Sequence, residues 1–196
     1  MVAEPRRQRI TVDNYLKIDR TSDKRHEYID GYAYAIAGRT VAHMRIAANM
    51  FMLLDEQLGE QGPCHAYSSD IRVQLSQARY VYLDVTISCD VADWREKGEI
   101  VRSPRLVVEV LSPTTELYDR GKKFTYYQEY TSVQEYALIG SQRQVVEVFR
   151  RTGKKWTYQR YGPAHTIELE SLDIQLPISA IYARVRVPIE DDEYGR

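Results

Sequence analysis

The stretch Pro104–Lys123, which reads PRLVVEVLSPTTELYDRGKK, carries the most informative strand and helix pattern of this chain. Its first half is an almost unbroken apolar run, the pattern of a strand that is covered on both faces. Glu109 interrupts this run between Val108 and Val110. A carboxylate in such a strand lowers stability unless it is paired or takes up a proton. Glu109 therefore marks a candidate functional position.

The second half of the stretch predicts a helix. Residues 112–116, SPTTE, are typical of a helix start, because a hydroxyl group caps the first turn and an acidic residue suits its positive end. We expect this helix to run to about Tyr130, and its inner face to consist of Leu117, Gly121, Phe124 and either Gln128 or Tyr127.

Two segments of alternating polarity precede this strand. Asp70–Leu75 and Tyr80–Asp90 carry apolar residues at every second position, as half-buried strands do. If the two segments pair as a hairpin, their apolar faces must lie on the same side of the sheet. That parity places Asp84 opposite either Asp70 or Arg72, on the polar face of the sheet.

The remaining segments complete a mixed β-sheet flanked by helices, which is an α/β (α+β) architecture. We expect a single domain over residues 1–196, with its core at about 25–160 and with C-terminal strands and an acidic tail at 161–196. The second helix should bury a stripe of apolar residues: Met44, Ala47, Phe51, Leu54 and Leu58, widened by Ile46, Met50 and Leu53. The expected elements are helices at 12–19 and 41–58, a hairpin at 27–38 that turns at Asp30-Gly31, strands at 133–140 and 144–150, and a further hairpin formed by 154–161 and 165–169.

Composition limits the classes of function. A hydrophobic content of 43% is ordinary for a globular protein, and the net charge of −1 argues against a protein that coats duplex DNA through broad charge neutralisation. The N-terminus has no apolar signal-peptide segment, and no apolar run is long enough to span a membrane. Cys64 and Cys89 cannot form a disulfide framework, and free thiols suit a reducing compartment. We therefore expect a cytoplasmic protein without membrane contacts.

Asp84 and Glu109 are the acidic residues that interrupt apolar strands, and the charged loop between them allows the strands to be neighbours. Two convergent carboxylates repel each other, and a shared hard cation with oxygen ligands relieves the repulsion. Mg²⁺ or Mn²⁺ held by carboxylates and water is an arrangement that activates water against a phosphodiester. A nearby lysine would complete such a site. The strand position two residues after Glu109 is Leu111, so the candidates are Lys122 and Lys123, of which Lys123 lies nearer the inner face.

The blocks RHEYIDGYAYAIAG, AHMRIAANM, YLDVTISCD, VEVLSPTTELYDRGKKF and VQEYALI resemble the Uma-two family of bacterial proteins. That family is similar to restriction endonucleases of the PD-(D/E)XK superfamily, and the resemblance covers roughly residues 10 to 160. It implies a metal-dependent nuclease fold that is usually dimeric. On this resemblance Asp84 takes the place of the PD aspartate, Glu109 that of the (D/E) glutamate and Lys123 that of the lysine, while Glu27 matches an acidic position that often joins the site. Leu83 stands where the motif usually has proline.

Three interpretations remain open. The first is a magnesium-dependent endonuclease, similar to endodeoxyribonucleases, with Asp84 and Glu109 as metal ligands, Lys123 and Glu27 as further catalytic residues, DNA as substrate and a homodimer as assembly. The second is a catalytically degenerate nuclease fold that serves as a binding or dimerisation module, which Leu111 favours. In the third, an arginine such as Arg72 simply neutralises Glu109.

Overall fold

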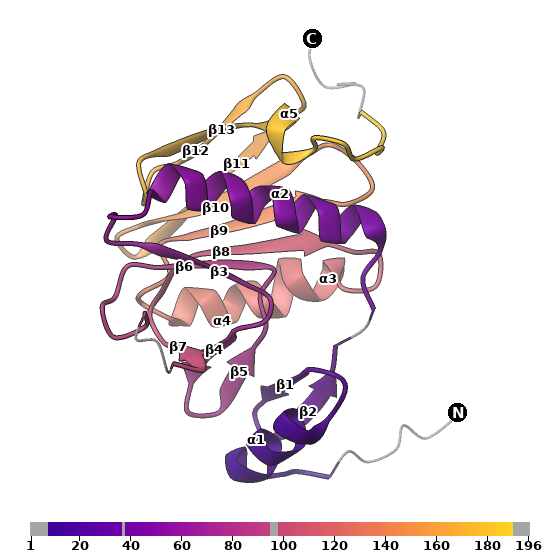
Figure 1. Ribbon diagram of the computed structural model, residues 1–196, viewed down its shortest axis with the longest axis vertical. Coiled ribbons are helices and arrows are strands. Elements are labelled where there is room, and N and C mark those ends of the chain that lie inside the picture. The colour runs from indigo at the N-terminus through magenta and orange to yellow at the C-terminus, as the bar shows by residue number, and fades with distance from the viewer. Residues whose placement is uncertain (1–7, 37, 95–97, 190–196) are drawn as a thin grey trace.

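The computed structural model describes residues 8–36, 38–94 and 98–189, and it contains two main sheets stacked along the long axis of the molecule (Figure 1). The six-stranded sheet has the order β11-β10-β9-β8-β6-β3. The five-stranded sheet has the order β2-β1-β5-β4-β7. In the first sheet the strands are β3 (His65–Ser68), β6 (Val85–Ser88), β8 (Pro104–Leu111), β9 (Glu135–Gly140), β10 (Val146–Thr152) and β11 (Lys155–Tyr161). In the second they are β1 (His26–Ile29), β2 (Tyr32–Ala35), β4 (Arg72–Ser76), β5 (Arg79–Val81) and β7 (Ile100–Val101).

Strand β8 is central, as its apolar run predicts. It pairs in parallel with β9 and antiparallel with β6. Leu106, Val108 and Val110 join one buried cluster, and Val107 and Leu111 join a second cluster on the opposite face. Glu109 has the parity of this second face, so its side chain points away from the first cluster.

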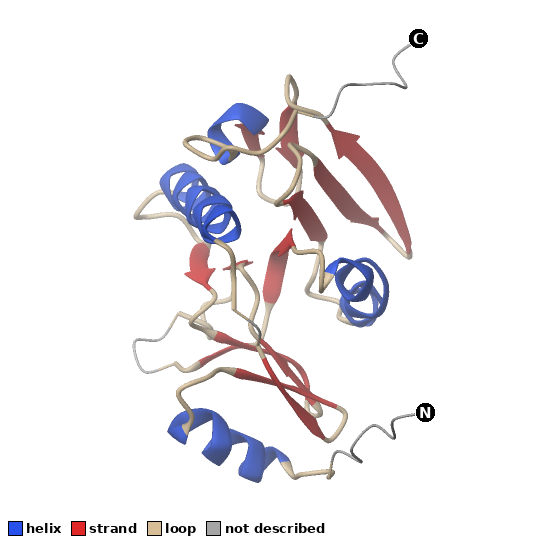
Figure 2. Cartoon of the chain, turned by 90° about the vertical axis from the view of Figure 1, so that its right-hand side faces the viewer, coloured by secondary structure: helices blue, strands red, loops and turns tan. Residues whose placement is uncertain are grey.

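Helices cover both faces of the six-stranded sheet (Figures 1 and 2). Helix α2 (Val41–Leu58) and the short α5 (Ile178–Ile181) pack on one face. The helical segment that follows β8 packs on the other, and it consists of α3 (Glu116–Tyr118), a π-helical turn η1 (Asp119–Lys123) and α4 (Phe124–Glu129). Within the described residues, no helix is long and apolar enough to cross a membrane.

Both helices expose a residue that the sequence pattern placed inside. Leu117 has an exposed fraction of 90% and Met44 one of 61%. In α2 the buried residues are Ile46, Met50 and Leu54, which belong to the expected stripe, and His43, which does not. In the segment after β8 the buried residues include Asp119 and Lys123 of η1 and Tyr127 of α4. The expected inner face is therefore wrong at Leu117, whereas Phe124 and Tyr127 pack in the second hydrophobic cluster as expected.

The hairpin of β4 and β5 forms, but it ends earlier than the alternation suggested. Pairing stops at Val73 and Val81, and the chain then leaves this sheet and enters the six-stranded sheet at Val85. Asp84 lies at this crossing, so it is paired opposite neither Asp70 nor Arg72. The continuous alternation hides the crossing because both sheets require the same period of two.

The C-terminal strands also pair differently from the expectation. β11 pairs along its length with β10, whereas β12 (Thr166–Leu169) pairs with β13 (Ile174–Pro177) in a separate two-stranded sheet. The expected hairpin of 154–161 with 165–169 is therefore wrong. Most of the acidic tail, residues 190–196, lies outside the described residues.

The two cysteines are not free thiols. β3 and β6 pair with His65 opposite Ser88, which brings the flanking residues Cys64 and Cys89 together at a Cα–Cα distance of 3.9 Å. They form a disulfide bond. The pairing follows from strand register, which the spacing of the two cysteines along the chain does not reveal.

The N-terminal hairpin forms as expected. Asp30 and Gly31, with φ of 50° and 100°, form the turn between β1 and β2. Helix α1 (Val12–Thr21) packs beside this hairpin and buries Tyr15 against Tyr28 and Tyr80. The layer of α1, β1 and β2 lies at the end of the molecule opposite to β12 and β13 (Figure 1).

Candidate metal and catalytic site

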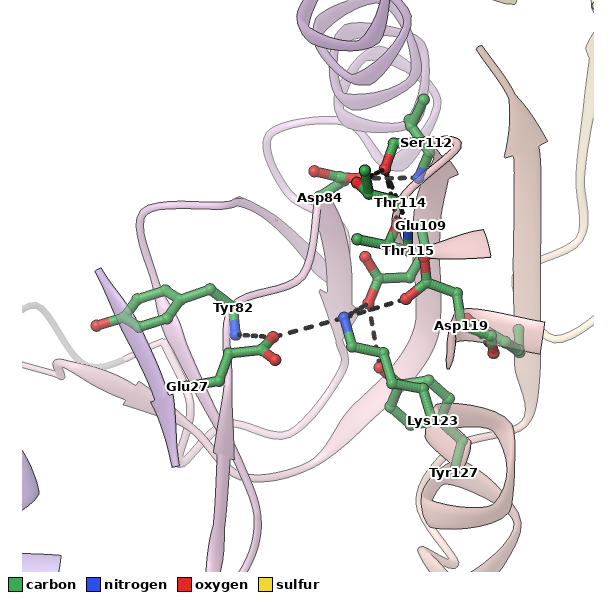
Figure 3. A network of polar contacts seen from close by, with 12 residues as sticks. Glu27, Tyr82, Asp84, Glu109, Ser112, Thr114, Thr115, Asp119, Lys123 and Tyr127 are labelled. Carbon is green, nitrogen blue, oxygen red and sulfur yellow. Dashed lines mark hydrogen bonds and ion pairs between the residues drawn. The ribbon is translucent and has the colours of Figure 1, made fainter. Parts of the chain in front are cut away.

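Glu109 lies at the centre of a buried polar network (Figure 3). Its Oε1 accepts a hydrogen bond from Lys123 Nζ at 2.8 Å and one from the hydroxyl group of Tyr127 at 3.2 Å. Burial raises the pKa of Glu109 to about 8; the ammonium group of Lys123 opposes the rise, and the negative charges of Asp119 and Asp84 add to it. The partner of Glu109 is thus Lys123 and not Arg72, whose guanidinium group bonds to Asp19 at 2.6 Å.

Lys123 joins three carboxylates from three different elements. Its Nζ lies 2.8 Å from Glu109 Oε1, 3.4 Å from Asp119 Oδ1 and 3.5 Å from Glu27 Oε1. Burial alone would lower the pKa of Lys123, but Glu109, Glu27 and Asp119 hold it well above its usual value. Lys123 is therefore a buried cation. The π-helical turn contributes both Asp119 and Lys123 to the interior, and such turns recur at functional sites.

Glu27 reaches this network from the N-terminal sheet. It lies on β1, and its Oε1 accepts a hydrogen bond from the backbone N–H of Tyr82 at 3.4 Å. Tyr82 belongs to the crossing between the two sheets, so Glu27 and Asp84 approach the site from the same junction (Figure 3).

Asp84 lies on the other side of Glu109 along β8. Its Oδ2 accepts a hydrogen bond from the backbone N–H of Val110 at 2.8 Å. Its Oδ1 lies 3.0 Å from His43 Nε2 and 3.1 Å from Arg39 Nη2. Burial would raise the pKa of Asp84, but His43, Arg39 and the Val110 N–H hold it below its usual range. Asp84 is therefore an ionised carboxylate.

All four residues that the sequence singled out line one cavity of about 500 Å³. The hydroxyl groups of Ser112, Thr114 and Thr115 stand on its upper rim, where they bond to one another (Figure 3). Leu111, at the usual lysine position, packs in the hydrophobic cluster with Tyr126 and Tyr127 instead. The lysine of the site accordingly comes from the helical segment.

Two residues that contact Asp84 do not follow from sequence reasoning. The sequence alone suggests no more than a packing or capping role for His43, and it does not single out Arg39. A signal for His43 exists: it occupies the position that continues the buried stripe of Ile46 and Met50, so it is a polar residue at an apolar position, as Glu109 is. This signal is missed when Met44 is taken as the first residue of the buried stripe, because His43 then falls outside the stripe. Arg39 lies in a connector without periodicity and gives no such signal.

The donor set fits a hard divalent cation in part. Within the described ranges no cluster of three or more His, Cys, Asp and Glu side chains is arranged to hold a metal ion. Asp84 and Glu109 supply carboxylate oxygens of the type that Mg²⁺ and Mn²⁺ prefer, and such ions keep several water ligands. Asp119 Oδ1 is buried, and its ion pair with Lys123 Nζ at 3.4 Å shares that ammonium group with Glu109 and Glu27. Three carboxyl groups thus surround one ammonium group, and a divalent cation would add positive charge to this acidic site.

Comparison with known proteins gives a consistent result. A family model named Uma2, described as "putative restriction endonuclease", matches residues 12–179. An uncharacterised protein of Synechocystis sp. is 31% identical over 176 residues, which cover 89% of this chain and 92% of that protein. A second one from the same organism is 28% identical over 150 residues, 75% of this chain and 84% of that protein.

The fold also matches a solved structure. A crystal structure from Anabaena variabilis, described as a "putative nuclease belonging to DUF820", superposes with a TM-score of 0.74 at 19% identity, covering 88% of this chain and 97% of that one. This likeness shows that the two chains share a fold. Because the Uma2 model matches most of the chain, the chain belongs to the Uma2 family. This is the Uma-two family that its sequence blocks resemble.

Proposed function

We propose that the protein is a metal-dependent endonuclease that hydrolyses phosphodiester bonds of nucleic acid, with DNA as its substrate and Mg²⁺ or Mn²⁺ as its cofactor. One observation carries this proposal. Asp84, Glu109 and Lys123 come from three separate elements and converge on one cavity, with Lys123 Nζ 2.8 Å from Glu109.

In the proposed reaction Asp84 and Glu109 hold the metal ion through their carboxylate oxygens. The bound ion would lower the pKa of a water ligand and neutralise charge on the phosphate. Lys123 donates to Oε1 of Glu109, so it orients this carboxylate. Its ammonium group also provides positive charge beside the position where negative charge grows on the phosphoryl oxygens. Glu27 and Asp119 hold Lys123 from two sides and keep it charged.

A second candidate function is a degenerate nuclease fold that acts as a binding or dimerisation module. The observation that favours it is the state of Asp84, whose Oδ1 already has two cationic or polar partners in His43 and Arg39. If these partners stay in place, Asp84 has little capacity left for a metal ion.

Thermal unfolding with and without millimolar Mn²⁺ separates the two candidates. A ligand that binds only the folded state raises its stability as its concentration increases. The nuclease proposal expects Mn²⁺ to stabilise the wild type and the control Glu56→Gln, an exposed position on α2, but not Glu109→Gln. An equal response, or no response, in all three proteins would contradict the proposed metal site.

Cleavage of a labelled oligonucleotide tests the role of the lysine. Lys122 and Lys123 are neighbours in η1, but Lys122 is exposed whereas Lys123 is buried in the site. We expect Lys123→Met to reduce the cleavage rate by about 10²-fold or more, the usual effect of removing one such charge-stabilising group. Lys122→Met should cleave like the wild type. Equal rates for the two variants would remove Lys123 from the mechanism.

The homodimer, which the family resemblance implies, belongs to the same proposal. So does the cytoplasmic location, which rests on cellular DNA as the substrate and no longer on free thiols, because Cys64 and Cys89 form a disulfide. Sedimentation equilibrium of the full chain measures the assembly, and a monomer at micromolar concentration would contradict the dimer.

A further inference from the structure

A second hollow adjoins the cavity of the site. It measures about 430 Å³ and shares Ile36, Gly38 and Arg39 with the site cavity. Arg39 lies at the junction, where its guanidinium group bonds to Asp84 at 3.1 Å and to Ser69 Oγ at 2.7 Å. The two hollows therefore lie side by side with Arg39 lining both, and together they are called the groove below.

The outer part of this groove carries two exposed cations. Lys24 and Arg25 line it, and neither forms an ion pair with a described residue. The guanidinium group of Arg25 lies over the ring of Tyr82, 5.5 Å from its centroid. Asp23 and Asp70 also line this hollow, so its positive character is limited to a narrow track. Such a track matches a few phosphates and not a broad duplex surface.

The inner part of the groove presents aromatic rings. Tyr34 and Tyr118 line the site cavity together with Tyr82. Tyr34 lies on β2 and has an exposed fraction of 37%, so part of its side chain is accessible to solvent beside the cavity. Bases without a pairing partner stack on such rings whatever their sequence, and aromatic rings beside a cationic track are typical of proteins that bind single strands.

The depth of the acidic residues points in the same direction. The side chains of Asp84 and Glu109 are 2% and 7% exposed, so the reacting phosphate must enter the cavity to reach them. In a duplex the phosphates belong to a stiff cylinder that a cavity of about 500 Å³ cannot enclose, whereas a flexible single strand can bend into it.

We infer that the substrate is a single-stranded segment of nucleic acid, whose phosphates run from Lys24 and Arg25 over Arg39 into the site and whose bases stack on Tyr34. This inference rests on the proposed nuclease function and specifies the substrate class of that same site.

Fluorescence anisotropy tests the inference without requiring cleavage. A labelled 12-nucleotide single strand and the matching duplex are titrated with the full chain in Ca²⁺, and a gel checks that the oligonucleotides stay intact. The single strand should bind at least about tenfold more tightly than the duplex. Tyr34→Ala should weaken single-strand binding by about tenfold, in line with the usual contribution of one stacked base, and Tyr34→Trp should restore it.

The cationic track is tested by the salt dependence of binding. The double variant Lys24→Ala/Arg25→Ala should lower the slope of log affinity against log salt by roughly 0.7 for each phosphate that is no longer neutralised. Lys154→Ala and Tyr158→Ala, at exposed positions near β11, serve as matched controls and should bind like the wild type.

Each result decides one of the two proposals. Duplex binding as tight as single-strand binding, or unchanged binding by the Tyr34 and Lys24/Arg25 variants, would overturn the single-strand inference even if the protein cleaves duplex DNA. Single-strand binding that depends on these residues, with no cleavage in Mg²⁺ or Mn²⁺, would contradict the nuclease proposal and with it the role of the strand as a substrate, while it would support the binding path along the groove.

Discussion

At the residue scale, burial of the Glu109 carboxyl group makes the free energy of unfolding depend on pH. Glu109 holds its proton up to about pH 8 in the folded protein, whereas an unfolded glutamate loses it near pH 4.3, roughly the usual value. Between these limits the folded state binds more protons than the unfolded state. The free energy of unfolding therefore falls with increasing pH, by at most about 1.4 kcal/mol per pH unit for this one group.

We expect Glu109→Gln to remove this pH dependence. Its amide oxygen can still accept the hydrogen bond from Lys123, but the amide does not ionise. In urea unfolding with a metal chelator, the stability of the variant relative to wild type should be lowest at pH 5 and should increase towards pH 8. A difference that is constant across this range would show that Glu109 is already ionised at pH 5 in the folded protein.

The sequence could predict part of this site at the same scale. Asp84 and Glu109 are visible because a charge interrupts an apolar pattern, and Lys123 and Glu27 follow from the family resemblance. The structure brings these four residues together. Arg39 was not predictable, because its contact with Asp84 joins two segments far apart in the chain and depends on how the connector before α2 crosses the sheet junction.

At the scale of elements, the segment after β8 shows why a helix pattern alone misplaced its inner face. A π-helical turn widens the helix between α3 and α4, so residues before and after the turn do not follow one period of 3.6. Leu117 is exposed as a result, and the charged pair Asp119 and Lys123 is buried. The ion pairs and hydrogen bonds of the site, and not the apolar pattern, therefore determine which residues of this segment are buried.

Two glycines near this segment should respond to alanine in opposite ways. A Cβ atom at Gly121 in η1 meets nothing within 4 Å, whereas one at Gly140 would lie 2.6 Å from the carbonyl oxygen of Arg143 and 2.9 Å from Val145. Gly121→Ala should raise the free energy of unfolding by roughly 0.5–1 kcal/mol, because alanine loses less backbone entropy in a helix. Gly140→Ala should lower it by about 1–3 kcal/mol through overpacking. Urea unfolding measures both, and destabilisation by Gly121→Ala would mean that the π-helical turn requires glycine.

Strand pairing was the least predictable feature of the elements. The alternation of β11 and β12 is clear in the sequence, but local patterns do not say that β11 pairs with β10 and β12 with β13. The disulfide of Cys64 and Cys89 has the same origin, because only the register of β3 against β6 brings the two cysteines together.

At the scale of the whole molecule, one buried ion pair joins the N-terminal layer to the rest of the protein. Asp19 of α1 accepts hydrogen bonds from Arg72 of β4 at 2.6 Å, from the hydroxyl group of Tyr82 and from the backbone N–H of His26 at 2.8 Å. Burial would raise the pKa of Asp19, but these hydrogen bonds lower it. Because Tyr82 also bonds to Glu27 through its N–H, this ion pair helps to position Glu27 in the site.

Arg72→Met should therefore destabilise the protein by about 3–5 kcal/mol, because it leaves Asp19 as a buried carboxylate without its cation. The double variant Asp19→Asn/Arg72→Met removes both charges and should recover part of this loss in urea unfolding at pH 7. The acid dependence provides a check. Since the pKa of Asp19 is lowered, its contribution in the wild type is complete above the unfolded value of about 3.9 and is lost as the pH falls through the folded value. The double variant should lack this acid-dependent loss; if it unfolds in acid with the same pH dependence as the wild type, Asp19 does not anchor the N-terminal layer.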